Sequence, residues 1–189
     1  MKDFPVCFRL EGHRVLVVGG GAVAEGKIRS LVAAGAVIRV IAPEVTGSIT
    51  ALAAAGMLEL LQRPFQAGDV AGHRLVFTAT DDRNVTQAAA LEAKQANVFL
   101  NAADEPDFCD FTLPSVGRQG LFTVAVSTDG AAPAVAARVR RRLMKELSVV
   151  DLGRVRLSDT LRRHLKRTPL RTAVLRWVAT FASSSRGIP

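Results

Sequence analysis

The chain has 189 residues, of which 49% are hydrophobic, and it carries a net charge of +8. This length suits one domain, or one domain with a small appendage, and is sufficient for an ordinary hydrophobic core. Its two cysteines, Cys7 and Cys109, exclude a disulfide-rich scaffold. No apolar run approaches the ~20 residues that span a bilayer. We therefore expect a cytoplasmic protein that has no membrane partner.

The positive charge is concentrated in the C-terminal part of the chain. From Arg138 onward there are 14 lysines and arginines and only three acids, a net charge of +11, whereas residues 1–137 carry −3. Such a charge attracts polyanions. It fits a solvated helix face, an acidic small molecule or a nucleic acid. Because the chain has one Trp, no Tyr and no recognition motif, we do not expect nucleic acid as a partner.

The first hundred residues alternate short apolar runs with longer amphipathic ones. Strands are expected over 14–18, 37–41, 57–61, 75–78 and 98–101, and helices over 22–34, 48–55 and 84–96. Gly35 and Gly56 are expected to end the first two helices. The apolar face of the first helix is expected to consist of Val23, Ile28, Leu31 and Val32. This order predicts an α/β fold with a Rossmann-like parallel sheet and helices on both faces.

The pattern changes after Asp110. Two β-rich runs, 111–116 and 121–127, are joined by a hairpin-like connection at 117–120, and a basic helix is expected over 133–147. Further helices are expected over 151–166 and 170–181. We therefore expect a Rossmann domain over 1–111, a small α+β region over 112–148 and a short helical part over 149–189.

A glycine-rich turn follows the first strand and precedes the first helix. Its sequence has the form G-x-G-x-x-A, in which Gly19 would make the tight turn and Gly21 would let the backbone approach a diphosphate. The free N–H groups at Ala22 and Val23 would bind that anion at the helix N-terminus. The alternative is a glycine-rich turn that binds no ligand.

The other strand ends supply further candidate cofactor contacts. The second strand lacks the usual acid for the ribose, and Glu44 comes slightly late, so the backbone at Pro43 and Glu44 is the candidate contact. The choice between NAD and NADP stays open. Thr80 follows the fourth strand, where it could touch the cofactor. Asp82 could serve there too, or could simply cap the next helix.

Two more groups are candidates for substrate chemistry. Asp104 leaves the fifth strand, where a carboxylate beside a nicotinamide could act as a general base or take protons from ring nitrogens. The alternative is a plain turn residue. The hydroxyls of Ser127 and Thr128 suit ligand carboxylates, or else Ser127, Thr128 or Asp129 caps the following helix. Cys109 is expected to be a small buried residue, and no metal-ligand spacing is present.

Several segments in one order match a known family. They include VVGGGAVAEGK at 17–27, NAAD at 101–104, FTLP at 111–114 and PAVAAR at 133–138, with shorter matches at 4–5, 42–44, 79–82 and 124–128. The chain resembles the precorrin-2 dehydrogenase/sirohydrochlorin ferrochelatase family, the N-terminal module of siroheme synthase. The resemblance covers about residues 4–147.

The resemblance implies NAD-dependent oxidation of precorrin-2 to sirohydrochlorin, with possible insertion of Fe2+ as a substrate metal. It places the family's key carboxylate on Asp104, and its cofactor contacts on Ala22, Val23, Pro43 and Glu44. It assigns substrate binding to Asn101, Ser127 and Thr128. Family members are homodimers joined by the region after residue 112. A polycarboxylate substrate such as precorrin-2 agrees with the basic C-terminal part.

Two residues depart from the family pattern, and one other function competes. Gly26 lies inside the first helix, and Asp129 adds a negative charge beside Ser127 and Thr128. The competing function is a regulatory module that senses NAD without catalysis, like the domains that gate potassium transport. Such modules usually keep the acid after the second strand, which is missing here.

Overall fold

The computed structural model describes residues 3–147. Contacts divide the chain into two units, Met1–Thr112 and Leu113–Pro189, and each is described by itself. The expected helices over 151–166 and 170–181 lie outside the described residues. Within the described part, no helix is long and apolar enough to cross a membrane.

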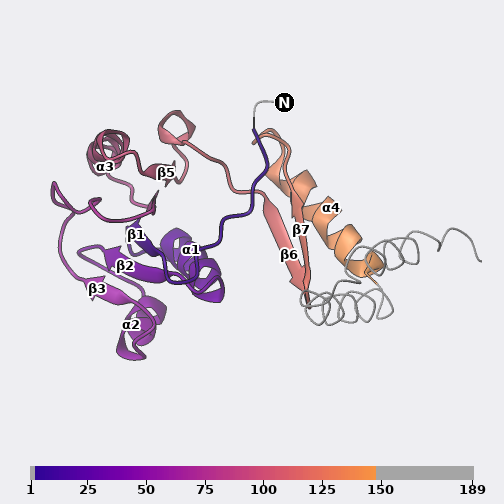
Figure 1. Cartoon of the computed structure of the whole chain (residues 1–189), viewed down its shortest axis with the longest axis horizontal. Helices are drawn as coiled ribbons and strands as arrows, with labels where there is room; N and C mark the ends of the chain where they lie inside the picture. Colours follow the sequence, from indigo (N-terminus) through magenta and orange to yellow (C-terminus); the bar gives the residue numbers. More distant parts are fainter. Residues whose placement is uncertain (1–2, 148–189) are drawn as a thin grey trace, which may run out of the picture. The chain divides into compact units, whose positions relative to one another are not determined.

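The first unit contains a five-stranded parallel sheet in the order β3-β2-β1-β4-β5 (Figure 1). The strands are β1 (Arg14–Val18), β2 (Val37–Ile41), β3 (Glu59–Leu61), β4 (Leu75–Thr78) and β5 (Phe99–Ala102). This confirms the Rossmann-like parallel sheet. The third strand begins two residues later than expected, because the Met57 N–H donates to Leu52 O and so closes the preceding helix.

Helices cover both faces of this sheet. They are α1 (Ala22–Ala33), α2 (Gly47–Ala54) and α3 (Arg83–Gln95). Successive strand side chains point to opposite faces, so Val15 and Val17 belong to the core cluster that contains residues of α1 and α2. Leu16 and Val18 belong to the cluster that contains residues of α3. The valine-rich β1 is therefore buried on both sides, as parallel strands of this fold are.

The buried face of α1 differs from the expected one at its first turn. Ala24, Ile28 and Leu31 are its buried residues. The expectation that Val23 faces the core is wrong, since its side chain is 53% exposed. Helical geometry puts Val23 about 100° from Ala24, and the sheet contacts the helix along the Ala24 side.

Gly26 is an exposed glycine in the middle of α1. A Cβ built there meets no atom within 4 Å. We expect Gly26→Ala to raise the free energy of unfolding by about 0.5–1 kcal/mol, because alanine loses less backbone entropy in a helix. Urea unfolding followed by circular dichroism measures this change, and a decrease in stability would contradict it.

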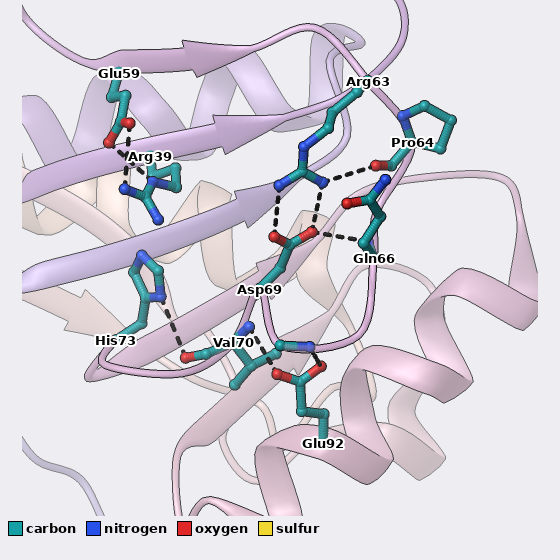
Figure 2. A network of polar contacts seen from close by, with 10 residues as sticks. Arg39, Glu59, Arg63, Pro64, Gln66, Asp69, Val70, His73 and Glu92 are labelled. Carbon is teal, nitrogen blue, oxygen red and sulfur yellow. Dashed lines mark hydrogen bonds and ion pairs between the residues drawn. The ribbon is translucent and has the colours of Figure 1, made fainter.

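The connection from β3 to β4 contains no helix and is held by polar contacts (Figure 2). The Arg63 guanidinium donates to both carboxylate oxygens of Asp69, at 2.8 and 2.6 Å. From α3, the Glu92 carboxylate accepts the N–H groups of Gly68 and Val70, at 3.1 and 3.0 Å. The hydrogen bonds from Arg63 hold the pKa of Asp69 below its usual value. These polar contacts fix the loop together with Val70, which is buried in the core, and Phe65, which packs against the same cluster.

His73 lies near the end of this connection and is buried, with 5% of its surface exposed. Its Nδ1 lies 3.2 Å from Val70 O, and its Nε2 has no hydrogen-bond partner among the described residues. Burial lowers the pKa of His73, and the charges of Arg39 and Arg14 lower it further. The folded protein therefore holds this imidazole neutral at a pH where the unfolded chain takes up a proton.

Because the pKa of His73 is lower in the folded protein than in the unfolded chain, we expect the stability to depend on pH. The contribution of His73 to the free energy of unfolding should be constant above the pKa of about 6.5 that histidine has in the unfolded chain. It should decrease as the pH falls below that value. His73→Asn can keep the hydrogen bond to Val70 but cannot titrate, so it should flatten this decrease. Urea midpoints at several pH values between 7.5 and 5 test it, with His13→Asn as the control. Equal pH dependence in wild type and His73→Asn would contradict the prediction.

The second unit, as far as it is described, is a two-stranded antiparallel sheet with one helix. Its elements are β6 (Ser115–Gln119), β7 (Phe122–Val126) and α4 (Pro133–Glu146). The expected hairpin was misplaced: residues 111–114 are not part of the strand, and 117–119 pair with β7 rather than forming the turn. Phe111 instead packs against the core of the first unit. The turn is Gly120-Leu121, and Gly120 has a φ of +58°.

Candidate nucleotide-binding site

The turn after β1 is tightly packed against its neighbouring strand ends. Gly19 has a φ of +122°, and a Cβ there would lie 2.0 Å from Ala79 O, the residue after β4. A Cβ on Gly20 would lie 2.1 Å from Glu44 O, in the loop after β2. Only glycine fits these two positions without moving backbone. Gly19 is thus required both for the turn and for the close approach of the backbone at Ala79. The sequence analysis did not predict that Gly20 must also be glycine.

The next residue is different, because Gly21 faces open space. A Cβ there would meet nothing within 4 Å. Gly21 is the N-cap of α1, and no side chain forms a capping hydrogen bond. Ala22 and Val23 follow it and are both exposed. The N-terminus of α1 therefore presents its partial positive charge toward accessible space, where an anion can bind.

The loop after β2 lies against this turn and is tied to α1. Gly20 O accepts the N–H of Thr46 at 2.9 Å. Thr46 Oγ1 donates to the Glu25 carboxylate at 2.8 Å, and this hydrogen bond lowers the pKa of Glu25. Pro43 and Glu44 stand exposed on the same loop. The candidate ribose contacts are thus beside the glycine turn, held by hydrogen bonds that the sequence did not reveal.

The strand on the other side of β1 contributes Thr80. Its Oγ1 accepts the Asp82 N–H at 3.2 Å, which closes a small turn after β4. The Asp82 carboxylate accepts the N–H groups of Asn84 and Val85. Asp82 is therefore the N-cap of α3, which confirms the capping role that was the alternative to a cofactor contact. Thr80 is half-buried and follows Ala79, the residue that touches Gly19.

Asp104 follows β5, at the same edge of the sheet as the glycine turn. It is exposed, and its φ of +60° is left-handed. The preceding residue is fixed, because the Ala103 N–H donates to Thr78 O at 2.8 Å. A non-glycine residue in this conformation is uncommon and mildly strained. The backbone that carries Asp104 thus leaves the sheet at a defined position, and a 3₁₀ helix that we did not expect, Pro106–Phe108, follows it.

A lysine that the sequence analysis did not single out lies between α1 and β5. Lys27 Nζ donates to Asn101 Oδ1 at 3.0 Å. Asn101 is buried, and its Nδ2 donates to Phe111 O at 2.9 Å. Cys109 is half-buried, and its Sγ donates to Ala102 O, as suits a small interior residue. Burial raises the pKa of Cys109, which disfavours a reactive thiolate.

Ser127 and Thr128 belong to the second unit and are described only with it. Ser127 Oγ accepts the Asp129 N–H at 3.1 Å, and Thr128 Oγ1 accepts the Ala132 N–H at 3.0 Å. The N-cap of α4 is Ala132, so the alternative that one of residues 127–129 is that N-cap is wrong. Both hydroxyl hydrogens stay available as donors. Among residues 3–147, no three His, Cys, Asp or Glu side chains are grouped closely enough to hold a metal ion.

The arrangement fits a dinucleotide. Parallel sheets of this order bind nucleotides off the carboxyl ends of their strands, where the order reverses beside β1. That edge carries the open Gly21, the uncapped α1 and the loop at Pro43 and Glu44. Thr80 and Asp104 follow β4 and β5, on the far side of β1 from that loop.

Comparisons with known proteins agree with this geometry. Residues 6–115 match the family described as "Putative NAD(P)-binding". The chain belongs to this family. Residues 122–145 match a second family, described as "Sirohaem biosynthesis protein central". Both findings confirm the resemblance inferred from the sequence motifs.

The chain is also similar to curated relatives and to one solved structure. Two siroheme synthases of Pseudomonas putida are 41% (strain F1) and 43% (strain W619) identical over 143 residues, 76% of this chain and 31% of theirs. Siroheme synthase 3 of Aeromonas hydrophila is 39% identical over 88% of this chain and 36% of its own length. The chain thus spans about a third of these relatives. The structure of SirC, precorrin-2 dehydrogenase, covers 96% of this chain and 90% of its own, with a TM-score of 0.81 and 24% identity, a match of fold.

Proposed function

We propose that this protein is an NAD-dependent dehydrogenase that oxidises precorrin-2 to sirohydrochlorin. The observation that carries the proposal is the shared sheet edge, where the open, uncapped N-terminus of α1 and the carboxylate of Asp104 both stand. The names of the relatives, siroheme synthase and precorrin-2 dehydrogenase, supply the substrate class.

The chemistry divides between cofactor and protein. Oxidation removes two hydrogens from precorrin-2, one as a hydride that NAD accepts and one as a proton. The N–H groups of Ala22 and Val23 would hold the diphosphate of NAD, and Gly21 would leave room for it. Asp104 accepts the proton as general base. Ser127 and Thr128 are proposed to bind the substrate by donating their hydroxyl hydrogens to its carboxylates. Asn101 is buried and its amide is hydrogen-bonded to Lys27 and Phe111, so its role toward the substrate is proposed to be indirect.

Incubation of the purified chain with NAD and precorrin-2 tests this function. We expect one NADH, followed at 340 nm, for each sirohydrochlorin formed. NAD binding without turnover, in an assay where a known dehydrogenase is active, would favour the regulatory module instead. With Fe2+ added, the later appearance of the sirohaem spectrum reports the second activity that the resemblance implies.

NAD is the proposed nucleotide in preference to NADP. The exposed Glu44 carboxylate stands on the loop where the adenosine ribose is expected, and it would repel a 2′-phosphate. Arg39, the arginine of β2, is held by Glu59 through hydrogen bonds of 2.8 and 3.2 Å. Titration with each nucleotide measures the preference, and equal affinity for both would contradict it.

We also propose that the protein is a homodimer joined through its second unit. The small two-stranded sheet and α4 leave several large apolar side chains exposed, namely Val116, Leu121, Val135, Val139 and Leu143. Such a surface is typical of a protein interface. Light scattering after gel filtration should give twice the chain mass, and Leu143→Glu should shift the protein toward monomer. A wild-type monomer would refute this proposal. The cytoplasmic location stays a prediction.

A further inference from the structure

Lys27 is a half-buried lysine on α1 with an unusual set of neighbours. Its Nζ donates to Asn101 Oδ1 at 3.0 Å and lies 5.4 Å from the centre of the Phe77 ring. No carboxylate of the described residues lies within ion-pair distance of it. A lysine usually keeps its charge in water. A charge that is partly removed from water beside a candidate site therefore needs an explanation.

The hydrogen bond from Lys27 fixes the orientation of the Asn101 amide. Lys27 can only donate, so it requires the amide oxygen on its side, and Phe111 O requires the amide nitrogen on the other. Asn101 lies in β5, three residues before Asp104. The chain of contacts from Lys27 thus connects α1, which begins at the candidate diphosphate site, with the strand that carries the candidate general base.

Electrostatics couple Lys27 to Asp104 as well. Burial lowers the pKa of Lys27, whereas the Cys109 thiolate and the Asp104 carboxylate act in the opposite direction. Asp104 is the one carboxylate in this set, and Cys109 stays a thiol at neutral pH because burial raises its pKa. At neutral pH the carboxylate of Asp104 is therefore the charged group among these neighbours that favours the protonated form of Lys27.

We propose that Lys27 is a positioning residue of the dehydrogenation, which orients the Asn101 amide in the strand that leads to Asp104 and adds a positive charge to this part of the site. This inference rests on the proposed function. A purely structural lysine would contribute to stability through packing on Phe77, and its loss would lower the amount of folded protein. A positioning lysine must also change turnover in protein that is fully folded.

The kinetic test compares Lys27→Met, which keeps the apolar stem, with Lys27→Arg, which keeps the charge. Lys94→Met, at an exposed lysine of α3, is the matched control. We expect Lys27→Met to lower kcat for precorrin-2 at least tenfold while the Kd for NAD changes less than twofold. Lys27→Arg should recover much of kcat and move the alkaline limb of the pH profile upward, because arginine keeps its proton.

A double mutant separates the two parts of the role. If Lys27 acts through the amide, Lys27→Met combined with Asn101→Ala should be little slower than Asn101→Ala alone. Wild-type kcat in folded Lys27→Met, or fully additive losses together with no rescue by arginine, would overturn the proposal. If the wild-type chain itself makes no NADH from precorrin-2, the proposed function fails, and the catalytic role of Lys27 fails with it.

A second measurement does not depend on activity. Titration of the Lys27 side chain, followed by NMR of its ¹³Cε resonance, reports the coupling directly. Asp104→Asn should lower the pKa of Lys27, since the carboxylate raises it, and Asp107→Asn should leave it unchanged. An unchanged titration in Asp104→Asn would show that the two charges are uncoupled and would overturn the electrostatic part of the proposal, whatever the turnover.

Discussion

Asp104→Asn is expected to lower kcat for precorrin-2 oxidation by roughly 10²-fold or more, the range typical for loss of a general base. Asparagine keeps the size of the side chain but cannot accept the proton. It also tolerates the left-handed backbone at this position, where φ is +60°. The Kd for NAD should stay within about twofold, because Asp104 stands beyond β4, away from the expected diphosphate.

Alanine is the less suitable replacement at this site. It loses the side chain and must also adopt a left-handed conformation, which costs roughly 1 kcal/mol. Asp107→Asn, an exposed aspartate in the following 3₁₀ helix, is the matched control. Steady-state NADH formation measures the effect. Equal loss of NAD affinity and turnover in Asp104→Asn would assign this residue a structural role.

The second prediction concerns the glycine turn. Substitution of Gly19 should lower stability, whereas substitution of Gly21 should weaken NAD binding. Gly19→Ala places a Cβ 2.0 Å from a backbone oxygen at a positive φ, so unfolding should become easier by about 3 kcal/mol or more. Gly21→Ala meets no protein atom. We expect it to leave stability almost unchanged and to weaken NAD binding at least tenfold, because the methyl group takes space needed by the diphosphate.

Urea unfolding and NAD titration of the two variants separate these effects. Gly26→Ala is the control, since it adds the same methyl group to open space five residues further along α1. It should bind NAD as the wild type does. Full NAD affinity in folded Gly21→Ala would mean that the dinucleotide does not approach the turn at this residue.

The sequence predicted the sheet well because its signals are local. Valine-rich runs such as 14–18 repeat between amphipathic stretches, and glycines such as Gly35, with a φ of +71°, end the helices. All pairings in the five-stranded sheet are parallel, so the carboxyl ends of its strands lie at one edge, which brings Gly21, Pro43 and Asp104 to that edge of the sheet. The candidate cofactor edge could therefore be expected from the sequence, although its ligand roles stay predictions.

The errors and omissions arose where distant residues decide the structure. Lys27 and Asn101 are 74 residues apart, and no periodicity connects them. The one available signal was a lysine inside the motif at 17–27. The hairpin was predicted at the wrong residues because phenylalanine is common in strands, whereas Phe111 packs against the core of the first unit. Gly117 was taken for a turn residue, but it lies in β6 where a Cβ would be 2.7 Å from Met144 Sδ.

A structure determined with NAD bound would show whether the dinucleotide lies across the carboxyl edge of the five-stranded sheet. We expect the diphosphate over the N–H groups of Ala22 and Val23, the adenosine toward Glu44, and the nicotinamide on the side of Thr80 and Asp104. A dinucleotide bound at another edge of the sheet, or one whose nicotinamide lies toward β3, would contradict it.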